Sequence, residues 1–162
     1  MFCVTGSEPA LDLSREELWR GLVRKAEDPC AFVAAITECR VLERRDAGLV
    51  REIVVRGERV RERVTFEPGR RVRFERLSGP VRGTILNEIE RDLAGELALR
   101  FTFALEADGR APGSLEERAY FRSMARAYMA SVRSTLAETR RLAARDRERR
   151  SGRAPAAAGG RS

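Results

Sequence analysis

Residues 114–143 read SLEERAYFRSMARAYMASVRSTLAETRRLA, and this stretch decides the fold. Ser114 with Glu117 three residues later forms a capping box, which predicts the start of a helix. Apolar and small residues then recur at steps of three and four as one stripe along a helix, namely Phe121, Met124, Ala125, Tyr128, Val132, Thr135, Leu136, Thr139 and Leu142. A helix of about 30 residues is about 45 Å long. It therefore requires a partner surface of similar length.

The stretch before this helix supplies that surface. From Ile36 onward the apolar residues alternate with charged ones, which is the period of a strand. Short turns rich in Gly, Pro and Asp separate six such segments, at about residues 36–41, 49–56, 59–66, 71–75, 81–90 and 97–105. This pattern predicts an antiparallel meander with one apolar face and one charged face. A sheet of this size curls, and we expect its concave face to wrap the long helix.

The N-terminal part predicts three shorter elements. Residues 2–5 are β-prone and suit a first strand. Ser14 and Glu17 form a second capping box, and the apolar stripe that follows predicts a helix to about residue 27. Pro29 ends that helix and suits the first position of a second short one. The expected order is a strand, two short helices, six strands and a long helix, which is an α+β fold.

Four short stretches carry a resemblance to a known family: LWRGL at 18–22, AEDP at 26–29, ITEC at 36–39 and GTILNEI at 83–89. Together with the element order, they resemble the AtaL-like branch of the START-like (SRPBCC, birch-pollen-allergen-like) superfamily, over about residues 8–143. The resemblance implies a helix-grip fold, in which a curved antiparallel sheet of six to seven strands wraps the C-terminal helix. It also implies a cavity between sheet and helix that holds an apolar or amphipathic small molecule. It implies no particular reaction.

Composition indicates one domain and limits its partners. We expect the domain to span residues 1–143, and the Arg/Ala/Gly-rich residues 144–162, which lack an apolar period, to be disordered. The net charge is +7, but 31 of the 32 basic residues are arginine, with Lys25 the single lysine. That bias is spread along the chain, so we expect no nucleic-acid partner. No run approaches about 18 apolar residues, so we expect no membrane span.

The cysteines and the absence of histidine exclude several kinds of site. Cys3, Cys30 and Cys39 fit no zinc spacing, and the chain has no histidine. Catalytic triads with a histidine base and the common histidine-based metal sites are therefore excluded, and we expect no metal and no cofactor. The odd cysteine count, and an N-terminus without a signal-peptide pattern, favour a reduced cytoplasmic protein. The sequence leaves the oligomeric state open.

A few polar residues interrupt the apolar face of the predicted sheet. With a two-residue turn at 57–58, Ile53 faces Glu62. A three-residue turn at the other end of the same strand places Arg76 opposite Glu62, with Arg51 on the diagonal. A lone buried carboxylate would cost several kcal/mol or stay protonated. Neighbouring guanidinium groups avoid most of that cost.

Two interpretations of these residues remain open. In the first, Glu62 and Arg76 form a buried ion pair that only fixes the strand register. In the second, Arg51, Glu62, Arg76 and Asn87 orient a ligand in a mostly apolar pocket. Asn87 lies on the apolar face of its own strand, where we expect Leu99 opposite.

The apolar candidates for ligand contact lie on the sheet and on the long helix. They are Phe101, Phe121, Met124 and Tyr128. A stripe of this kind more often belongs to the hydrophobic core. In a helix-grip fold, part of it packs on the sheet and part of it covers the cavity. Tyr128 is the strongest candidate on the helix, because its hydroxyl needs a partner when buried.

Three functions follow as hypotheses. The favoured one is non-catalytic binding of a hydrophobic or amphipathic small molecule, such as a lipid, polyketide or aromatic metabolite. The alternative is an enzyme of the polyketide cyclase, dehydratase or isomerase type with Glu62 as general acid or base, an analogy that rests on the fold. Flanking arginines lower the pKa of such a carboxyl and make it a poor acid. The third is protein interaction through the arginine-rich tail.

Overall fold

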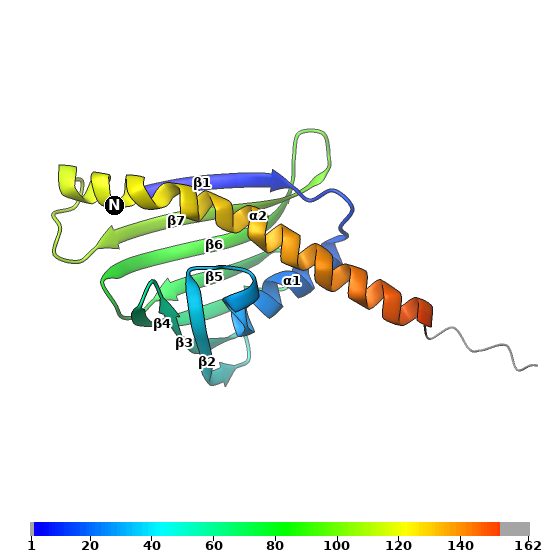
Figure 1. The fold of residues 1–162 in the computed structure, drawn as a ribbon. Coiled ribbons are helices and arrows are strands. Elements are labelled where there is room, and N and C mark those ends of the chain that lie inside the picture. The colour runs from blue at the N-terminus through cyan, green and yellow to red at the C-terminus, as the bar shows by residue number, and fades with distance from the viewer. Residues whose placement is uncertain (1, 153–162) are drawn as a thin grey trace, which may run out of the picture.

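The computed structural model describes residues 2–152, in which one antiparallel sheet is crossed by a long helix (Figure 1). The elements are β1 (Phe2–Pro9), α1 (Arg15–Glu27), the short 3-10 helix η1 (Pro29–Ala31), β2 (Ile36–Arg45), β3 (Gly48–Val55), β4 (Glu58–Glu67), β5 (Arg71–Arg76), β6 (Val81–Arg91), β7 (Leu97–Ala107) and α2 (Leu115–Gly152). The strands lie in the order β1-β7-β6-β5-β4-β3-β2. The predicted α+β class, the meander and the long helix are confirmed. The first strand is longer than expected.

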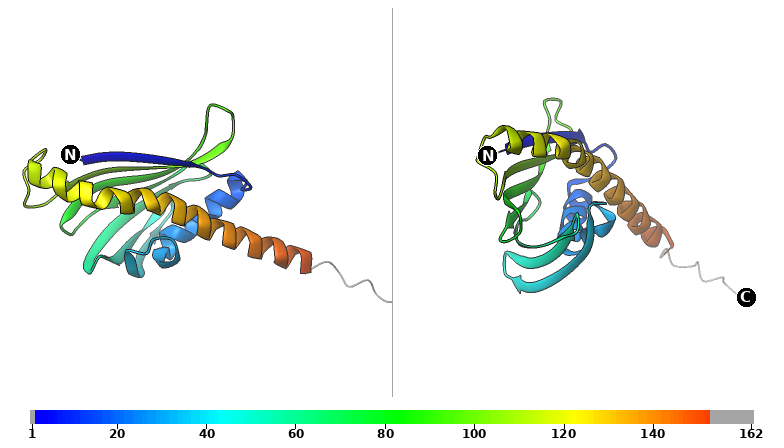
Figure 2. Two further views of the ribbon diagram at one scale, coloured as in Figure 1. Left: turned by 45° about the horizontal axis from the view of Figure 1, so that its top comes forward. Right: turned by 60° about the vertical axis from the view of Figure 1, so that its left-hand side comes forward.

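The sheet curls, and the two α-helices lie on its concave side (Figure 2). α2 packs against β1, β7 and α1, and α1 also contacts β6 and β2. α2 therefore covers the β1–β7 side of the concave face, while α1 contacts β6 and β2, and η1 contacts β2. The capping box at Ser14 is formed, because its hydroxyl accepts from the Glu17 amide and the Glu17 carboxylate accepts from the Ser14 amide.

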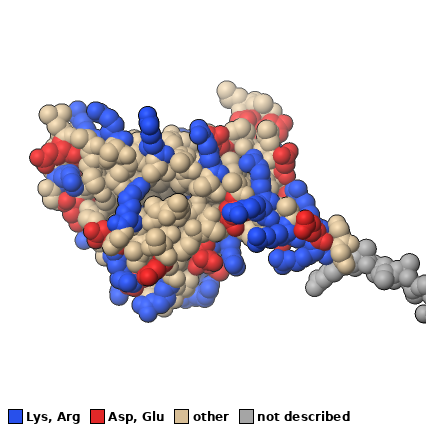
Figure 3. All heavy atoms as spheres, in the orientation of Figure 1, with Lys and Arg blue, Asp and Glu red and all other residues tan. Residues whose placement is uncertain are grey.

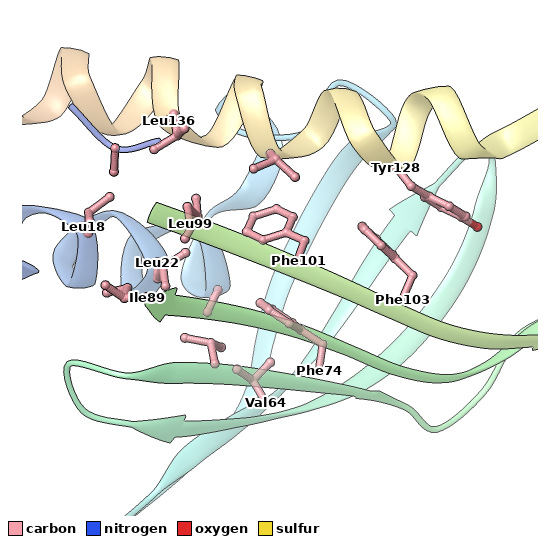
Figure 4. Packing of buried hydrophobic residues seen from close by; sticks show 14 of the residues in the cluster. Leu18, Leu22, Val64, Phe74, Ile89, Leu99, Phe101, Phe103, Tyr128 and Leu136 are labelled. Atoms are coloured by element: carbon pink, nitrogen blue, oxygen red, sulfur yellow. The ribbon is translucent and has the colours of Figure 1, made fainter. Parts of the chain in front are cut away.

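The core fills the space where α1, α2 and the sheet meet (Figure 4). Leu18 and Leu22 of α1 and Leu136 of α2 pack onto Leu99 and Phe101 of β7. Burying one such side chain contributes about 1.5–3 kcal/mol. A smaller apolar cluster of Ile36, Ile53, Val55 and Val60 lies towards the β2 edge. Between these two clusters the packing is incomplete, and this gap holds the candidate site.

The register of β3 on β4 differs from the prediction. Arg56 and Gly57 form the turn, with φ angles of 50° and 80°, values typical of the type I′ turns that suit hairpins. Ile53 consequently pairs with Val60, and Glu62 pairs directly with Arg51, so the predicted Ile53–Glu62 pairing was wrong. The shift is two residues, so each side chain keeps its face.

Of the two other pairings predicted for candidate site residues, one is confirmed and one was wrong. Glu62 pairs with Arg76, as predicted. Asn87 pairs with Phe101 and not with Leu99.

The end of α2 also differs from the prediction. The helix continues to Gly152, so the expectation of disorder was wrong for residues 144–152. Polar contacts with the start of the domain replace the missing apolar period: Arg147 Nη2 lies 2.7 Å from Glu17 Oε1, and Asp146 Oδ2 lies 3.4 Å from Arg20 Nη1. The expectation for residues 153–162 falls outside the described residues.

Charged side chains of both signs are interspersed over the face shown in Figure 3, with basic groups densest towards the C-terminal half of α2. On the outer face of the sheet, Arg40, Arg59 and Arg61 surround Glu52. No helix within residues 2–152 is long and apolar enough to cross a membrane. Within the same residues, no three His, Cys, Asp or Glu side chains lie close enough together to hold a metal ion.

Candidate functional site

A cavity of about 260 Å³ lies between the concave face of the sheet and the middle of α2. Its apolar walls come chiefly from Ile36, Ile53, Phe74, Ile85, Phe103 and Tyr128. Its charged lining groups are Lys25, Arg51, Arg56, Glu62 and Arg76. Ala34 and Ala35 of the η1–β2 connection and Ala127 and Ala130 of α2 also line it.

Strand pairing divides the cavity floor into two rows. Phe74, Ile85 and Phe103 stand side by side across β5, β6 and β7 and form an apolar row. From α2, the Tyr128 ring stacks on Phe103 with centroids 4.6 Å apart and planes 17° from parallel. Figure 4 shows this pair beyond the packed core, with the tyrosine hydroxyl directed away from Leu18 and Leu22.

The second row is charged and crosses β3, β4 and β5. Arg51, Glu62 and Arg76 are direct neighbours in it. Arg51 Nε and Nη2 donate to Glu62 Oε1 at 3.0 and 2.7 Å. Arg51 Nη1 donates to the carbonyl oxygens of Lys25 and Ala26 at 3.1 and 2.9 Å. Those carbonyls end α1 and carry the negative end of its dipole, so Arg51 fastens α1 to the sheet.

Glu62 is held as a carboxylate. It is 1% exposed, and burial alone would raise its pKa, but the charges of Arg51 and Arg76 and the hydrogen bonds from Arg51 outweigh burial and lower the pKa. Arg76 approaches less closely, with its Nε 3.4 Å from Glu62 Oε2. This Nε makes no hydrogen bond within the described part of the chain.

Lys25 was not among the residues predicted for the site. The residue is 6% exposed, and its amine donates to Asn87 Oδ1 at 2.6 Å. It also lies 4.4 Å from the ring centroid of Phe101. Burial, and then repulsion from Arg51, lower the pKa of Lys25 to about 7, against the attraction of Glu62.

A sequence signal for Lys25 was present. It follows Leu22 by three residues and Leu18 by seven, which places it on the apolar face of α1. It is also the single lysine in a chain that otherwise uses arginine.

The structure brings together half of the residues predicted for the site. Arg51, Glu62, Arg76 and Tyr128 line the cavity. The other four lie outside its lining, namely Asn87, Phe101, Phe121 and Met124. Asn87 is fully buried and accepts a hydrogen bond from Lys25, and Phe121 stacks on Phe2 with centroids 4.6 Å apart. Apolar spacing marks the inner face of an element without distinguishing core from cavity wall.

A second hollow, of about 550 Å³, lies between α1 and α2. It has the larger volume, but its lining includes Arg20, Arg24, Arg145 and Asp146, and Arg20 pairs with Asp146 across it. We take the smaller cavity under α2 as the site, because apolar walls with a few convergent polar groups are typical of small-molecule sites.

Residues 5–146 match the family described as Acetylaranotin biosynthesis cluster protein L, or AtaL. The chain belongs to the AtaL family. The match covers the sheet except for the first three residues of β1, all of α1 and most of α2, and it includes every residue that lines the cavity. No curated protein sequence matches this AtaL-family chain.

Solved structures similar to this AtaL-family chain share its fold. The protein TTHA0849 from Thermus thermophilus has a TM-score of 0.69 and 17% identity, over 88% of this chain and 99% of that chain. The Zhui aromatase/cyclase from Streptomyces sp. R1128 has a TM-score of 0.57 and 23% identity, over 99% and 96%. A START superfamily protein from Mycobacterium smegmatis has a TM-score of 0.57 and 15% identity, over 81% and 97%. The helix-grip fold is therefore confirmed.

Proposed function

We propose that the protein binds a hydrophobic or amphipathic small molecule, such as a lipid, a polyketide or an aromatic metabolite, and does so without catalysis. The observation that carries the proposal is the cavity of about 260 Å³ between sheet and α2, with apolar walls and one charged row. The neighbour named as a START superfamily protein supports the binding function, whereas the neighbour named as an aromatase/cyclase suits the enzyme alternative equally well. The cysteines are free in the described residues, which fits the cytoplasmic location that we also propose.

Native mass spectrometry of the purified protein tests this function. We expect either a co-purified small molecule or uptake of added 1-dodecanol with one molecule per chain. Burial of the dodecyl chain against Phe74, Ile85 and Phe103 supplies the driving force, at about 25 cal/mol for each Å² of apolar surface removed from water. A protein that carries no ligand and takes up neither dodecanol nor a neutral aromatic dye would contradict the proposal.

Filling the cavity should weaken this uptake. Ile85 lies in the centre of the apolar row and lines the cavity, so Ile85→Trp places an indole where the ligand would lie. We expect dodecanol binding, measured by titration calorimetry, to weaken at least about tenfold, which corresponds to about 1.4 kcal/mol.

Val23→Trp is the matched control for Ile85→Trp. Val23 lines the hollow between α1 and α2, so the same bulk is added outside the proposed site and binding should persist. Circular dichroism should show both variants folded. Equal loss of binding in the two variants would count against the cavity under α2.

The enzyme alternative has less support. Glu62 stays ionised beside Arg51 and Arg76, so it has no proton to give as a general acid. Its Oε1 already accepts two hydrogen bonds from Arg51, which weakens it as a base. The protein-interaction alternative concerns residues 144–162, of which 144–152 belong to α2. The absence of a nucleic-acid partner remains a prediction.

A further inference from the structure

We infer that the ligand of the cavity carries an acidic group, a carboxylate or an enolate, and that Arg76 and Lys25 bind this group. The inference rests on the proposed function and specifies the chemical class of the ligand. The acidic end would lie over the charged row on β3, β4 and β5. The apolar body would lie over Phe74, Ile85 and Phe103 beneath Tyr128.

The first argument is the charge balance of the cavity. Four basic side chains line it, of which Lys25 and Arg51 are buried, Arg76 is partly buried and Arg56 is exposed, against the single carboxylate of Glu62. Glu62 is engaged mainly by Arg51, at 2.7 Å, and lies farther from Arg76, at 3.4 Å. Positive charge in an apolar enclosure is costly unless an anion accompanies it. An acidic ligand supplies that anion.

The second argument is the hydrogen-bonding capacity that the protein leaves unused. Arg51 has partners for Nε, Nη1 and Nη2. Arg76 Nε makes no hydrogen bond within residues 2–152, although its side chain is only 11% exposed. Lys25 Nζ makes one hydrogen bond, to Asn87, and carries at least one further N–H donor whether or not it is protonated.

The unused hydrogen-bonding groups of Arg76 and Lys25 are therefore donors. A ligand that offers only hydrocarbon at this end leaves them unpaired in an apolar enclosure, which costs free energy. A carboxylate or enolate accepts their hydrogen bonds, and charge-assisted bonds of this kind are the stronger ones. An acidic apolar molecule thus fits both rows of the floor, whereas a neutral hydroxyl or carbonyl accepts the same hydrogen bonds but supplies no negative charge.

Titration calorimetry with two ligands of equal chain length, dodecanoate and 1-dodecanol, tests the inference. We expect the wild-type protein to bind dodecanoate at least about tenfold more tightly than dodecanol. In Arg76→Gln, dodecanoate binding should weaken more than dodecanol binding, so that the ratio of the two affinities falls to near one, and circular dichroism should show that the variant is folded. Arg73→Gln is the matched control, since Arg73 lies on the same strand with an exposed side chain, and it should keep the wild-type ratio.

The outcomes separate this inference from the proposed function. Dodecanol binding as tight as dodecanoate binding in the wild type would overturn the acidic-ligand inference and leave the binding function standing. Binding of neither ligand would overturn both. If Arg76→Gln does not fold, the same titrations on Lys25→Gln provide a second test. An unchanged preference for dodecanoate in Lys25→Gln would overturn the assigned role of Lys25.

Discussion

Replacing Glu62 with glutamine is expected to destabilise the fold by about 3–5 kcal/mol, the usual cost of removing one partner from a buried ion pair. The substitution preserves shape but leaves the guanidinium groups of Arg51 and Arg76 in the interior with no carboxylate beside them. It also weakens the attachment of α1, because Arg51 joins Glu62 to the carbonyls of Lys25 and Ala26. Urea unfolding followed by the fluorescence of Trp19, the single tryptophan, measures the effect.

Glu75→Gln is the control for this experiment. Glu75 pairs with Arg63 at 3.3 Å on the same two strands, but these side chains are 42% and 43% exposed. Exposed pairs contribute about 0–1 kcal/mol, so this variant should lose little stability. A Glu62→Gln variant no less stable than Glu75→Gln would contradict the buried ion pair.

The difference in the free energy of unfolding between wild type and Glu62→Gln should depend on pH. The pKa of Glu62 is lower in the folded protein than its ordinary value of 4.5, so the unfolded state takes up a proton first as the pH falls. The stabilisation by the carboxylate is therefore complete above the unfolded pKa and is lost as the pH falls through the folded pKa. Urea unfolding should show that the free energies of unfolding of the two proteins converge as the pH falls from neutral to acidic.

Lys25 should make stability rise with pH above neutrality. Its pKa is about 7 in the folded protein and 10.5 ordinarily, so between these values the unfolded state binds the extra proton. The free energy of unfolding then increases with pH across this window, by a few kcal/mol at most, since one pKa unit corresponds to about 1.4 kcal/mol. The groups that act on the amine are Arg51 on β3, Glu62 on β4 and Asn87 on β6.

Comparison with Lys25→Met isolates this effect. Cysteines and tyrosines also ionise above neutral pH, but they are present in both proteins and cancel in the difference. The variant leaves Asn87 Oδ1 without its donor, a loss that does not depend on pH. We expect wild type to gain stability relative to Lys25→Met between pH 7 and 10, measured by urea unfolding. Parallel pH profiles would show that the amine is not desolvated in the fold.

Much of the architecture could be predicted because it follows from local patterns. Alternation and turn residues placed the six strands, and the turn that begins at Pro68 gave the correct pairing of Glu62 with Arg76. The β3–β4 turn was misplaced by one residue, because it requires Arg56, a residue with a side chain, to adopt a φ of 50°. Sequence alone offers little warning of that conformation. The last turns of α2 depend on distant polar partners such as Glu17, which no local pattern reveals.

The site could be predicted only in part, for a related reason. Charged residues on an apolar face are visible in a strand pattern, and Arg51, Glu62 and Arg76 were found in that way. Lys25 reaches the same row from α1, and its position depends on how that helix packs on the sheet. Whether an aromatic residue fills core or lines a cavity also depends on packing between elements, so Tyr128 and Phe121 looked alike in the sequence.

The most direct test of the account is methyl NMR of the wild-type protein during titration with dodecanoate. Binding in the cavity should shift the methyl signals of Ile53, Val55 and Ile85, which line it. The signals of Val23 and Leu142, which line the hollow between α1 and α2, should stay in place. Shifts confined to Val23 and Leu142, or no shifts at saturating dodecanoate, would contradict a ligand site between the sheet and α2.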